Sequence, residues 1–151
     1  MANAVCEIVV TKNRLNRVVA EPDGASGAIV EFFGVVRQDE SGREVEGIDY
    51  EANVKMADHQ LRQIARDAAE RFSLRRVILH HRIGFVGVGE ASLFLQVRAQ
   101  RRSAAFGASE WIVDELKKKV PIWKKPKFKS GDIVGGIADA GPRSATAAAT
   151  T

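Results

Sequence analysis

The part of the chain that decides the fold is residues 92–123, SLFLQVRAQRRSAAFGASEWIVDELKKKVPIW. Its first eight residues alternate between apolar and polar side chains, which is typical of a half-buried β-strand. The side chains that this alternation turns inward are Leu93, Leu95, Val97 and Ala99. The rest of the stretch has a helical period, so the sequence predicts a strand followed closely by a helix.

The predicted helix begins at Ser103, a residue type that favours the N-cap position, and runs to about Val120. Pro121 follows its end, as expected where a helix stops. Lysines 117–119 fall in its last turn, where the helix dipole favours cations. The apolar stripe, which falls within one arc of the helix, is Ala105, Ala108, Ile112 and Leu116.

Outward from this stretch, the pattern predicts a second long helix and four more strands. Apolar side chains recur at helical spacing from Val54 to Phe72, over about five turns. Ala28–Val36 is almost wholly apolar, which predicts a buried strand. The predicted strands are Cys6–Thr11, Ala28–Val36, Gly47–Ala52 and Arg76–Arg82.

The segments between these elements are expected to be irregular. Leu15–Ala20 is predicted to be a short helix or turn, Arg37–Glu46 a polar loop and Ile83–Glu90 a turn region. Helices that alternate with pairs of strands argue against a doubly wound sheet. We expect an α+β fold, with an antiparallel sheet and two main helices packed on it.

Length and composition indicate one globular domain. The chain has 151 residues, of which 45% are hydrophobic and 28% charged. We place the domain at residues 1–140 and expect residues 141–151, mostly Ser, Ala and Thr, to be a disordered tail. The single cysteine, Cys6, excludes an internal disulfide framework and a cysteine-based zinc site. With no apolar run near the ~20 residues of a membrane span and no signal-peptide pattern, we expect a cytoplasmic protein without a membrane partner.

The positive charge is concentrated in one segment. Between Arg98 and Lys129 the sequence has ten Lys or Arg residues and three acids, a charge of +7. Because the whole chain carries +4, the remainder carries −3. A basic segment on an otherwise acidic body indicates an anionic partner, which could be nucleic acid, a phosphorylated metabolite or an acidic protein surface.

Several cations of this segment could serve a site or could simply be solvated. Lys117 lies one step outside the apolar arc, where half-sheltering would lower the pKa of its amine. It could equally be a lysine that reaches solvent at a helix end. Arg101 and Arg102 precede the helix and could clamp a phosphate, or only keep the loop soluble. Trp123 beside Lys124 could form the wall of a pocket for a flat heterocycle, or fill the edge of the core.

The remaining candidates are an arginine, two neighbouring histidines and the cysteine. Arg37 follows a predicted strand, from which a cation could point into a cleft or simply end the strand in solvent. His80 and His81 are neighbours in a predicted strand, so they point to opposite faces and cannot chelate one metal. We interpret one of them as a structural histidine, and Cys6 as packed in its strand rather than reactive.

Six short stretches together resemble one known family. They are Gly27–Arg37 (GAIVEFFGVVR), Tyr50–Ala52, His81–Gly84, Val88–Ser92, Arg102–Phe106 and Leu116–Lys125 (LKKKVPIWKK). In this order, over about Cys6 to Lys129, they resemble the large, catalytic subunit of molybdopterin synthase. The last stretch is the most specific of the six.

The resemblance implies an α/β hammerhead-type fold and a homodimer of this chain within a heterotetramer. Each end of the dimer would bind a small ubiquitin-like sulfur-carrier subunit, whose C-terminal Gly-Gly thiocarboxylate enters a pocket of the large subunit. The implied reaction installs two sulfurs on cyclic pyranopterin monophosphate, which forms the dithiolene of molybdopterin. The resemblance implies a sulfurtransferase without a metal or another cofactor, and a pterin rather than a nucleic acid as its ligand.

The resemblance also assigns roles by position. The essential lysine of the family falls on Lys117 and its second pocket lysine on Lys124. Substrate contacts fall on Val35, Val36, Arg37, Arg101, Arg102, Lys117, Lys124, Lys125 and Pro126. The family has His-Arg before the second helix, supplied by the neighbouring subunit. Here the first of these positions is Arg101, which stays charged and can bind an anion but cannot transfer a proton.

Two other kinds of function remain open at this stage. The basic segment could bind nucleic acid, although its few aromatic residues are not interleaved as stacking platforms. The chain could also dock a ubiquitin-like protein without catalysing a reaction, if Arg101 in place of histidine disables the site.

Overall fold

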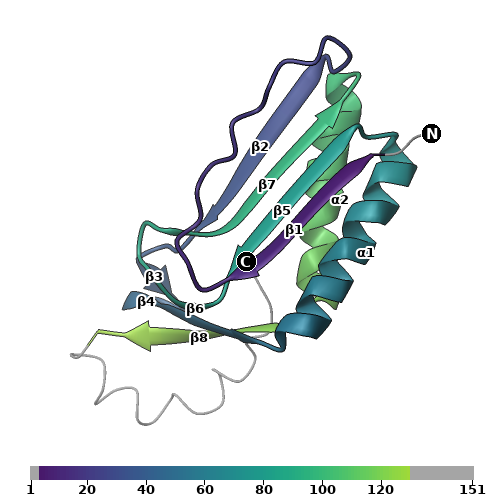
Figure 1. Cartoon of the computed structure of the whole chain (residues 1–151). Helices are drawn as coiled ribbons and strands as arrows, with labels where there is room; N and C mark the ends of the chain where they lie inside the picture. Colours follow the sequence, from purple (N-terminus) through teal and green to yellow (C-terminus); the bar gives the residue numbers. More distant parts are fainter. Residues whose placement is uncertain (1–3, 130–151) are drawn as a thin grey trace.

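The computed structural model describes residues 4–129, which form two β-sheets and two long helices (Figure 1). The predicted tail, residues 141–151, lies outside the described residues. In chain order the elements are β1 (Val5–Thr11), β2 (Ala28–Val35), β3 (Asp39–Glu40), β4 (Arg43–Ala52), α1 (Val54–Phe72), β5 (Arg76–Arg82), β6 (Gly84–Gly87), β7 (Ala91–Ala99), α2 (Arg102–Lys119) and β8 (Ile122–Phe128). The predicted α+β class is confirmed.

The larger sheet has the strand order β1-β5-β7-β2, with both helices on one of its faces (Figure 1). Strand β7 pairs antiparallel with β5 and β2, as expected. Strand β1 pairs parallel with β5, so the sheet is mixed rather than antiparallel. The long connection between β1 and β5, which includes β2, β3, β4 and α1, allows the two strands to run in the same direction.

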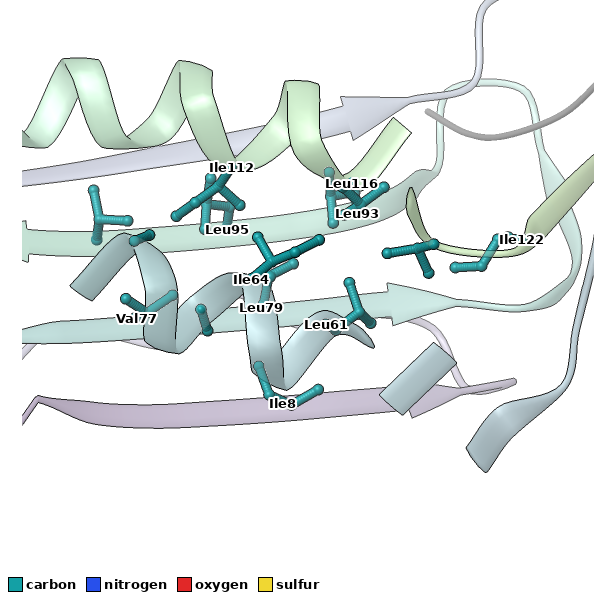
Figure 2. Close-up of a cluster of buried hydrophobic side chains, with 14 of the residues drawn as sticks. Ile8, Leu61, Ile64, Val77, Leu79, Leu93, Leu95, Ile112, Leu116 and Ile122 are labelled. Carbon is teal, nitrogen blue, oxygen red and sulfur yellow. The ribbon is translucent and has the colours of Figure 1, made fainter. Parts of the chain in front are cut away.

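The core lies between the helices and this sheet (Figure 2). The four side chains predicted to face inward from β7 are fully buried, as is the predicted apolar stripe of α2. Leu61 and Ile64 of α1 pack against the same core. Burying a side chain such as Leu61 stabilises the fold by about 1.5–3 kcal/mol. This core holds α2 in place, and therefore also the lysines of its last turn.

The second, smaller sheet contains segments that we expected to be irregular. Strand β4 pairs with β3, β6 and β8. The predicted polar loop Arg37–Glu46 is wrong, because β3 and the start of β4 form a tight hairpin whose turn residues Ser41 and Gly42 have positive φ. The predicted turn region Ile83–Glu90 contains β6, and the lysine-rich segment after Pro121 forms β8.

Strand β2 forms as predicted, but its burial is not as predicted. It is an edge strand of the larger sheet, and Ile29, Phe32, Phe33 and Val35 are exposed in the single chain. An apolar run therefore identified the strand but did not show that a neighbouring layer covers it. An exposed apolar edge strand is a surface that commonly pairs with another chain.

Two predicted local features are wrong. Leu15–Ala20 forms neither a helix nor a turn. It belongs to an extended segment held by side chains of the larger sheet, because Arg17 pairs with Glu31 at 2.7 Å and the Gln96 amide donates to the Val18 carbonyl at 2.8 Å. Helix α2 has Arg101 rather than Ser103 at its N-cap, and the Arg101 side chain makes no capping hydrogen bond.

Candidate active site

Two predicted site residues meet at one carboxylate. Lys124 of β8 places its Nζ 3.3 Å from Oε2 of Glu40, and Arg37 places its Nη2 3.7 Å from the same oxygen. The Lys124 side chain is 24% exposed and the Glu40 side chain 16% exposed, so this contact is partly sheltered from water. Residues 37 and 124, far apart in the sequence, are therefore brought together by the β3–β4 hairpin and by β8.

Tyr50 lies beside this ion pair. It is the register partner of Lys124 across the β4–β8 pair, and directly paired side chains in an antiparallel ladder lie on one face. Burial raises the pKa of the Tyr50 hydroxyl most strongly, a hydrogen bond with Ser92 lowers it, and the nearby Glu40 charge raises it further. Tyr50 therefore stays a neutral phenol at pH 7, buried beside the charged groups.

The alternation of β8 separates residues that are neighbours in the sequence. Lys125 pairs with Glu51 at 3.0 Å, on the opposite face of the strand from Lys124. Pro126 shares the face of Lys124 and lies opposite Ile48 of β4. Lys124 and Lys125 therefore do not face one common pocket within a single chain.

The residues at the end of β2 are held mainly by backbone hydrogen bonds. Val36 is buried, and its amide donates to the Glu90 carbonyl at 3.0 Å while its carbonyl accepts from the Gly89 amide at 2.9 Å. Val35 is exposed. These bonds hold the chain at the point where Arg37 leaves the strand.

Lys117 lies in the last turn of α2, at the end of the helix that leads into β8 (Figure 1). It is exposed in the single chain, so the half-sheltering predicted from the helical wheel is not found there. Lys118 and Lys119 of the same turn both pair with Glu115, at 3.6 and 2.8 Å. Lys117 has no such partner among the described residues.

Arg101 and Arg102 lie at the other end of α2. Fifteen residues separate Arg102 from Lys117, which corresponds to roughly 22 Å along a helix. Both arginines are exposed. A single chain therefore does not bring these arginines to Lys117 and Lys124.

Most of the basic segment is neutralised locally. Six of its ten cations pair with acids at 4 Å or less: Arg98, Lys118, Lys119, Lys124, Lys125 and Lys129. Among the described residues the four that do not are Arg101, Arg102, Lys117 and Lys127. Three of these four are predicted site residues. The charge left for an anionic ligand is thus at both ends of α2 and not spread along a continuous stripe.

A cleft of about 430 Å³ lies beside the smaller sheet. Trp123, whose side chain is 48% exposed, lines it together with Lys12 and Glu51. Of the two interpretations of Trp123, the wall of a pocket therefore fits and the filling of the core edge does not. Tyr50 and Glu51, neighbours on β4, both line the cleft, whereas Lys124 and Lys125 do not.

The sequence did not point to Glu40, and it did not show which of the two neighbouring histidines is structural. Glu40 lay in the predicted polar loop, and only the hairpin register brings it to Lys124. His81 is the structural histidine: it is fully buried, its Nδ1 is 2.8 Å from the Arg82 carbonyl, and burial lowers its pKa to about 4. His80 instead contacts Glu7 at 2.8 Å. Burial also raises the pKa of the Cys6 thiol, as expected for a packed cysteine.

Neither helix of the described part of the chain is long and apolar enough to cross a membrane. Within residues 4–129, no group of three His, Cys, Asp or Glu side chains is arranged to hold a metal ion.

The chain is similar to the proteins of one known family. The sequence model of the MoaE protein family matches residues 7–119. The molybdopterin synthase catalytic subunit of Pyrococcus abyssi is 42% identical over 109 residues, which is 72% of this chain and 74% of that protein.

Solved structures show the same fold. Molybdopterin synthase from Staphylococcus aureus superposes with a TM-score of 0.70 at 30% identity, over 83% of this chain and 92% of that one. A Helicobacter pylori chain, solved as a complex of subunits 1 and 2 of molybdopterin-converting factor, shares the fold with a TM-score of 0.59 at 18% identity, over 84% of this chain and 91% of that one. The chain therefore belongs to the MoaE family, the catalytic subunits of molybdopterin synthase, which are enzymes of molybdenum cofactor biosynthesis.

Proposed function

We propose that this chain transfers sulfur from a thiocarboxylated ubiquitin-like small subunit to cyclic pyranopterin monophosphate. The thiocarboxylate sulfur forms a carbon–sulfur bond to the substrate while a carbon–oxygen bond at the same carbon breaks, and the displaced oxygen leaves as water or stays on the phosphate. Water then cleaves the acyl–sulfur bond and returns the small subunit as a carboxylate. Two such transfers give the dithiolene of molybdopterin. Family membership favours this enzyme over a nucleic-acid binder and over a docking scaffold without activity.

The observation that carries the proposal is the meeting of Arg37 and Lys124 on one sheltered carboxylate. Two cations from distant segments that converge on an acid oxygen can also converge on the negatively charged atoms of a phosphate or a thiocarboxylate. In this proposal Arg37 and Lys124 hold an anion at the start of β8. The backbone at Val35 and Val36 fixes the position from which Arg37 extends.

Lys117 is the proposed proton-transfer group. It lies at the same end of α2 as β8 and has no acidic partner among residues 4–129 that would hold its ammonium elsewhere. Its charge would stabilise the negative charge that develops as the sulfur attacks. Closure of the site by the small subunit would shelter this amine, which the single chain leaves exposed. Lys125 and Pro126 would contact the substrate at the rim.

We propose that the complete site needs a second copy of this chain. Arg101 and Arg102 lie roughly 22 Å from Lys117 along α2, so they can reach a common ligand only from a neighbouring protomer. The exposed apolar edge formed by β2 supports such a homodimer, because edge strands with large apolar side chains tend to pair.

The proposed second partner is the small subunit that carries the sulfur. The Helicobacter pylori protein of the same fold was solved in complex with subunit 1 of molybdopterin-converting factor. By analogy, two small subunits and two copies of this chain would form a heterotetramer. Its location in the cytoplasm stays a prediction.

The test is turnover of a Lys117→Ala variant, reconstituted with thiocarboxylated small subunit and pterin substrate. We expect dithiolene formation to fall by about 100-fold or more, as for loss of a general acid–base group. Lys127→Ala is the matched control, since Lys127 is another cation without an acidic partner among the described residues. Near-normal dithiolene formation by Lys117→Ala would remove Lys117 from the mechanism.

A second variant tests the departure from the family at Arg101. Arg101→His restores the residue type of the family at this position. If Arg101 serves only as an anion contact, this variant changes the KM for the substrate and leaves kcat within about twofold. A large rise in kcat would instead show that the family histidine transfers a proton that Arg101 cannot.

A further inference from the structure

Glu40 occupies the place where an anionic ligand would be expected. One of its oxygens, Oε2, lies 3.3 Å from the Lys124 ammonium and 3.7 Å from the Arg37 guanidinium. The carboxylate is 16% exposed, which makes it the more sheltered member of both ion pairs. Glu40 therefore engages Lys124 in a sheltered contact and Arg37, whose side chain is 79% exposed, in a longer one.

The hairpin holds Glu40 firmly in this position. Glu40 pairs with Arg43 in the β3–β4 ladder, the turn between them is only Ser41 and Gly42, and the amide of Val45 donates to the Gln38 carbonyl at 2.9 Å. The hairpin therefore fixes the Glu40 backbone beside the two cations, while rotation of its side chain allows a ligand to displace the carboxylate. Tyr50 of β4 is buried and lies directly across the strand pair from Lys124 of β8.

The net charge of Glu40 and its two cationic partners indicates the role of Glu40. Arg37, Lys124 and Glu40 together carry +1, whereas the two cations alone would carry +2. Like charges held together repel one another, so a carboxylate between them keeps both side chains converged on one point. The same carboxylate competes with any other anion for the two cations.

We propose that Glu40 is an internal counter-anion that keeps Arg37 and Lys124 converged in the empty site and sets how tightly the enzyme binds its anionic ligand. The phosphate or thiocarboxylate must displace it, so Glu40 weakens ligand binding and favours release after each transfer. Glu40 is a positioning residue, because it acts through the two cations. The identity of the ligand rests on the proposed function. The competition between Glu40 and an anion for the two cations does not.

The experiment measures binding of inorganic phosphate at low ionic strength to the full chain and to a Glu40→Gln variant, which removes the charge and keeps the shape. We expect the Kd for phosphate to fall by about fivefold, the effect of one unit charge at a few ångströms in water. The gain should shrink at high salt, because screening weakens it. In the reconstituted enzyme, the KM for the pterin substrate should fall in the same proportion.

The matched control is Glu44→Gln, on the same hairpin. Glu44 pairs with Lys129, which directly follows β8, at 3.4 Å, but both side chains are more than half exposed and neither contacts Arg37 or Lys124. This variant makes the same change in net charge and should leave the Kd within about 1.5-fold, because exposed charges are strongly screened. A double variant, Glu40→Gln with Lys124→Met, should lose the gain.

Three results overturn the inference: an unchanged or weaker phosphate affinity in Glu40→Gln, an equal gain in Glu44→Gln, or no phosphate binding by either protein. The proposed function fails separately, by turnover. If Lys124→Met keeps normal turnover while Glu40→Gln tightens phosphate binding, the anion site exists but does not serve sulfur transfer. If Lys124→Met abolishes turnover and Glu40→Gln leaves phosphate affinity unchanged, only the role of Glu40 is wrong.

Discussion

The separation of Arg102 from Lys117 predicts that two defective copies of this chain can restore each other. The two residues lie at opposite ends of α2, roughly 22 Å apart. If each active site takes Lys117 from one protomer and Arg102 from the other, Lys117→Ala and Arg102→Ala each inactivate both sites of their own homodimer. A mixed dimer has one site with both changes and one site with neither.

The size of the recovery follows from this count. Purified mixed dimers have one intact site of two, so they should recover about half of the wild-type turnover per dimer. Random assembly of equal amounts makes about half of all dimers mixed, so an unseparated mixture should recover about one quarter. Each variant alone should stay at about 1% or less of wild type.

The assay uses co-expressed variants with different affinity tags, purified on both tags in sequence. Dithiolene formation is then measured with saturating thiocarboxylated small subunit, so that only intact sites limit the rate. A tagged wild-type pair carried through the same steps sets the full rate. Lys127→Ala paired with Arg102→Ala is the control, because its mixed dimer should keep one site of two whether or not Lys117 is shared.

Mixed dimers without recovered activity would refute the reasoning, provided that they form and bind the small subunit. Such a result would mean that Lys117 and Arg102 of one protomer serve the same site. Substantial activity of either variant alone would likewise exclude the residue concerned from the machinery.

Three further predictions concern stability. A Gly47→Ala change would drive a Cβ into the Val86 carbonyl oxygen and the Phe85 ring, so we expect a loss of about 1–3 kcal/mol, measured by urea unfolding. Leu61→Ala empties a fully buried site in the core and should cost about 2–5 kcal/mol, with the same measurement. His81 has its pKa lowered by burial from 6.5 to about 4, so the unfolded chain binds a proton between these values that the folded chain does not. Stability should therefore fall by about 2–3 kcal/mol as the pH drops from 6.5 to 4.5, and a His81→Leu variant should lack this part of the pH dependence.

Much of the fold followed from local patterns. The helical period from Val54 to Phe72 and the alternation that ends at Ala99 each match an observed element. The period of the helix is readable because one of its faces is buried. Strand β7 is buried on both faces, and its alternation is readable because Ser92, Gln96 and Arg98 alternate with the apolar residues of the core. The predictions failed where no such period exists, as in the extended segment Leu15–Ala20 and the short hairpin at Ser41.

Burial in the single chain was less predictable than strand formation. The apolar residues of β2 suggested a covered strand, yet the strand lies at an edge with Phe32 and Phe33 exposed. An apolar run predicts that the surface of the strand is covered in the assembled, functional protein. The apolar run does not show whether the same chain or another chain covers that surface.

The amino-acid sequence by itself determined which segments become helices and strands, which family they resemble and which cations are candidates for the site. Tertiary structure decided which of those cations meet. Only the β3–β4 hairpin and the β4–β8 register bring Arg37 and Lys124 to Glu40, and only the length of α2 keeps Arg101 away from Lys117. Helical and strand periods depend on neighbours within a few residues, whereas the meeting of side chains more than eighty residues apart depends on how whole elements pack, which no local pattern encodes.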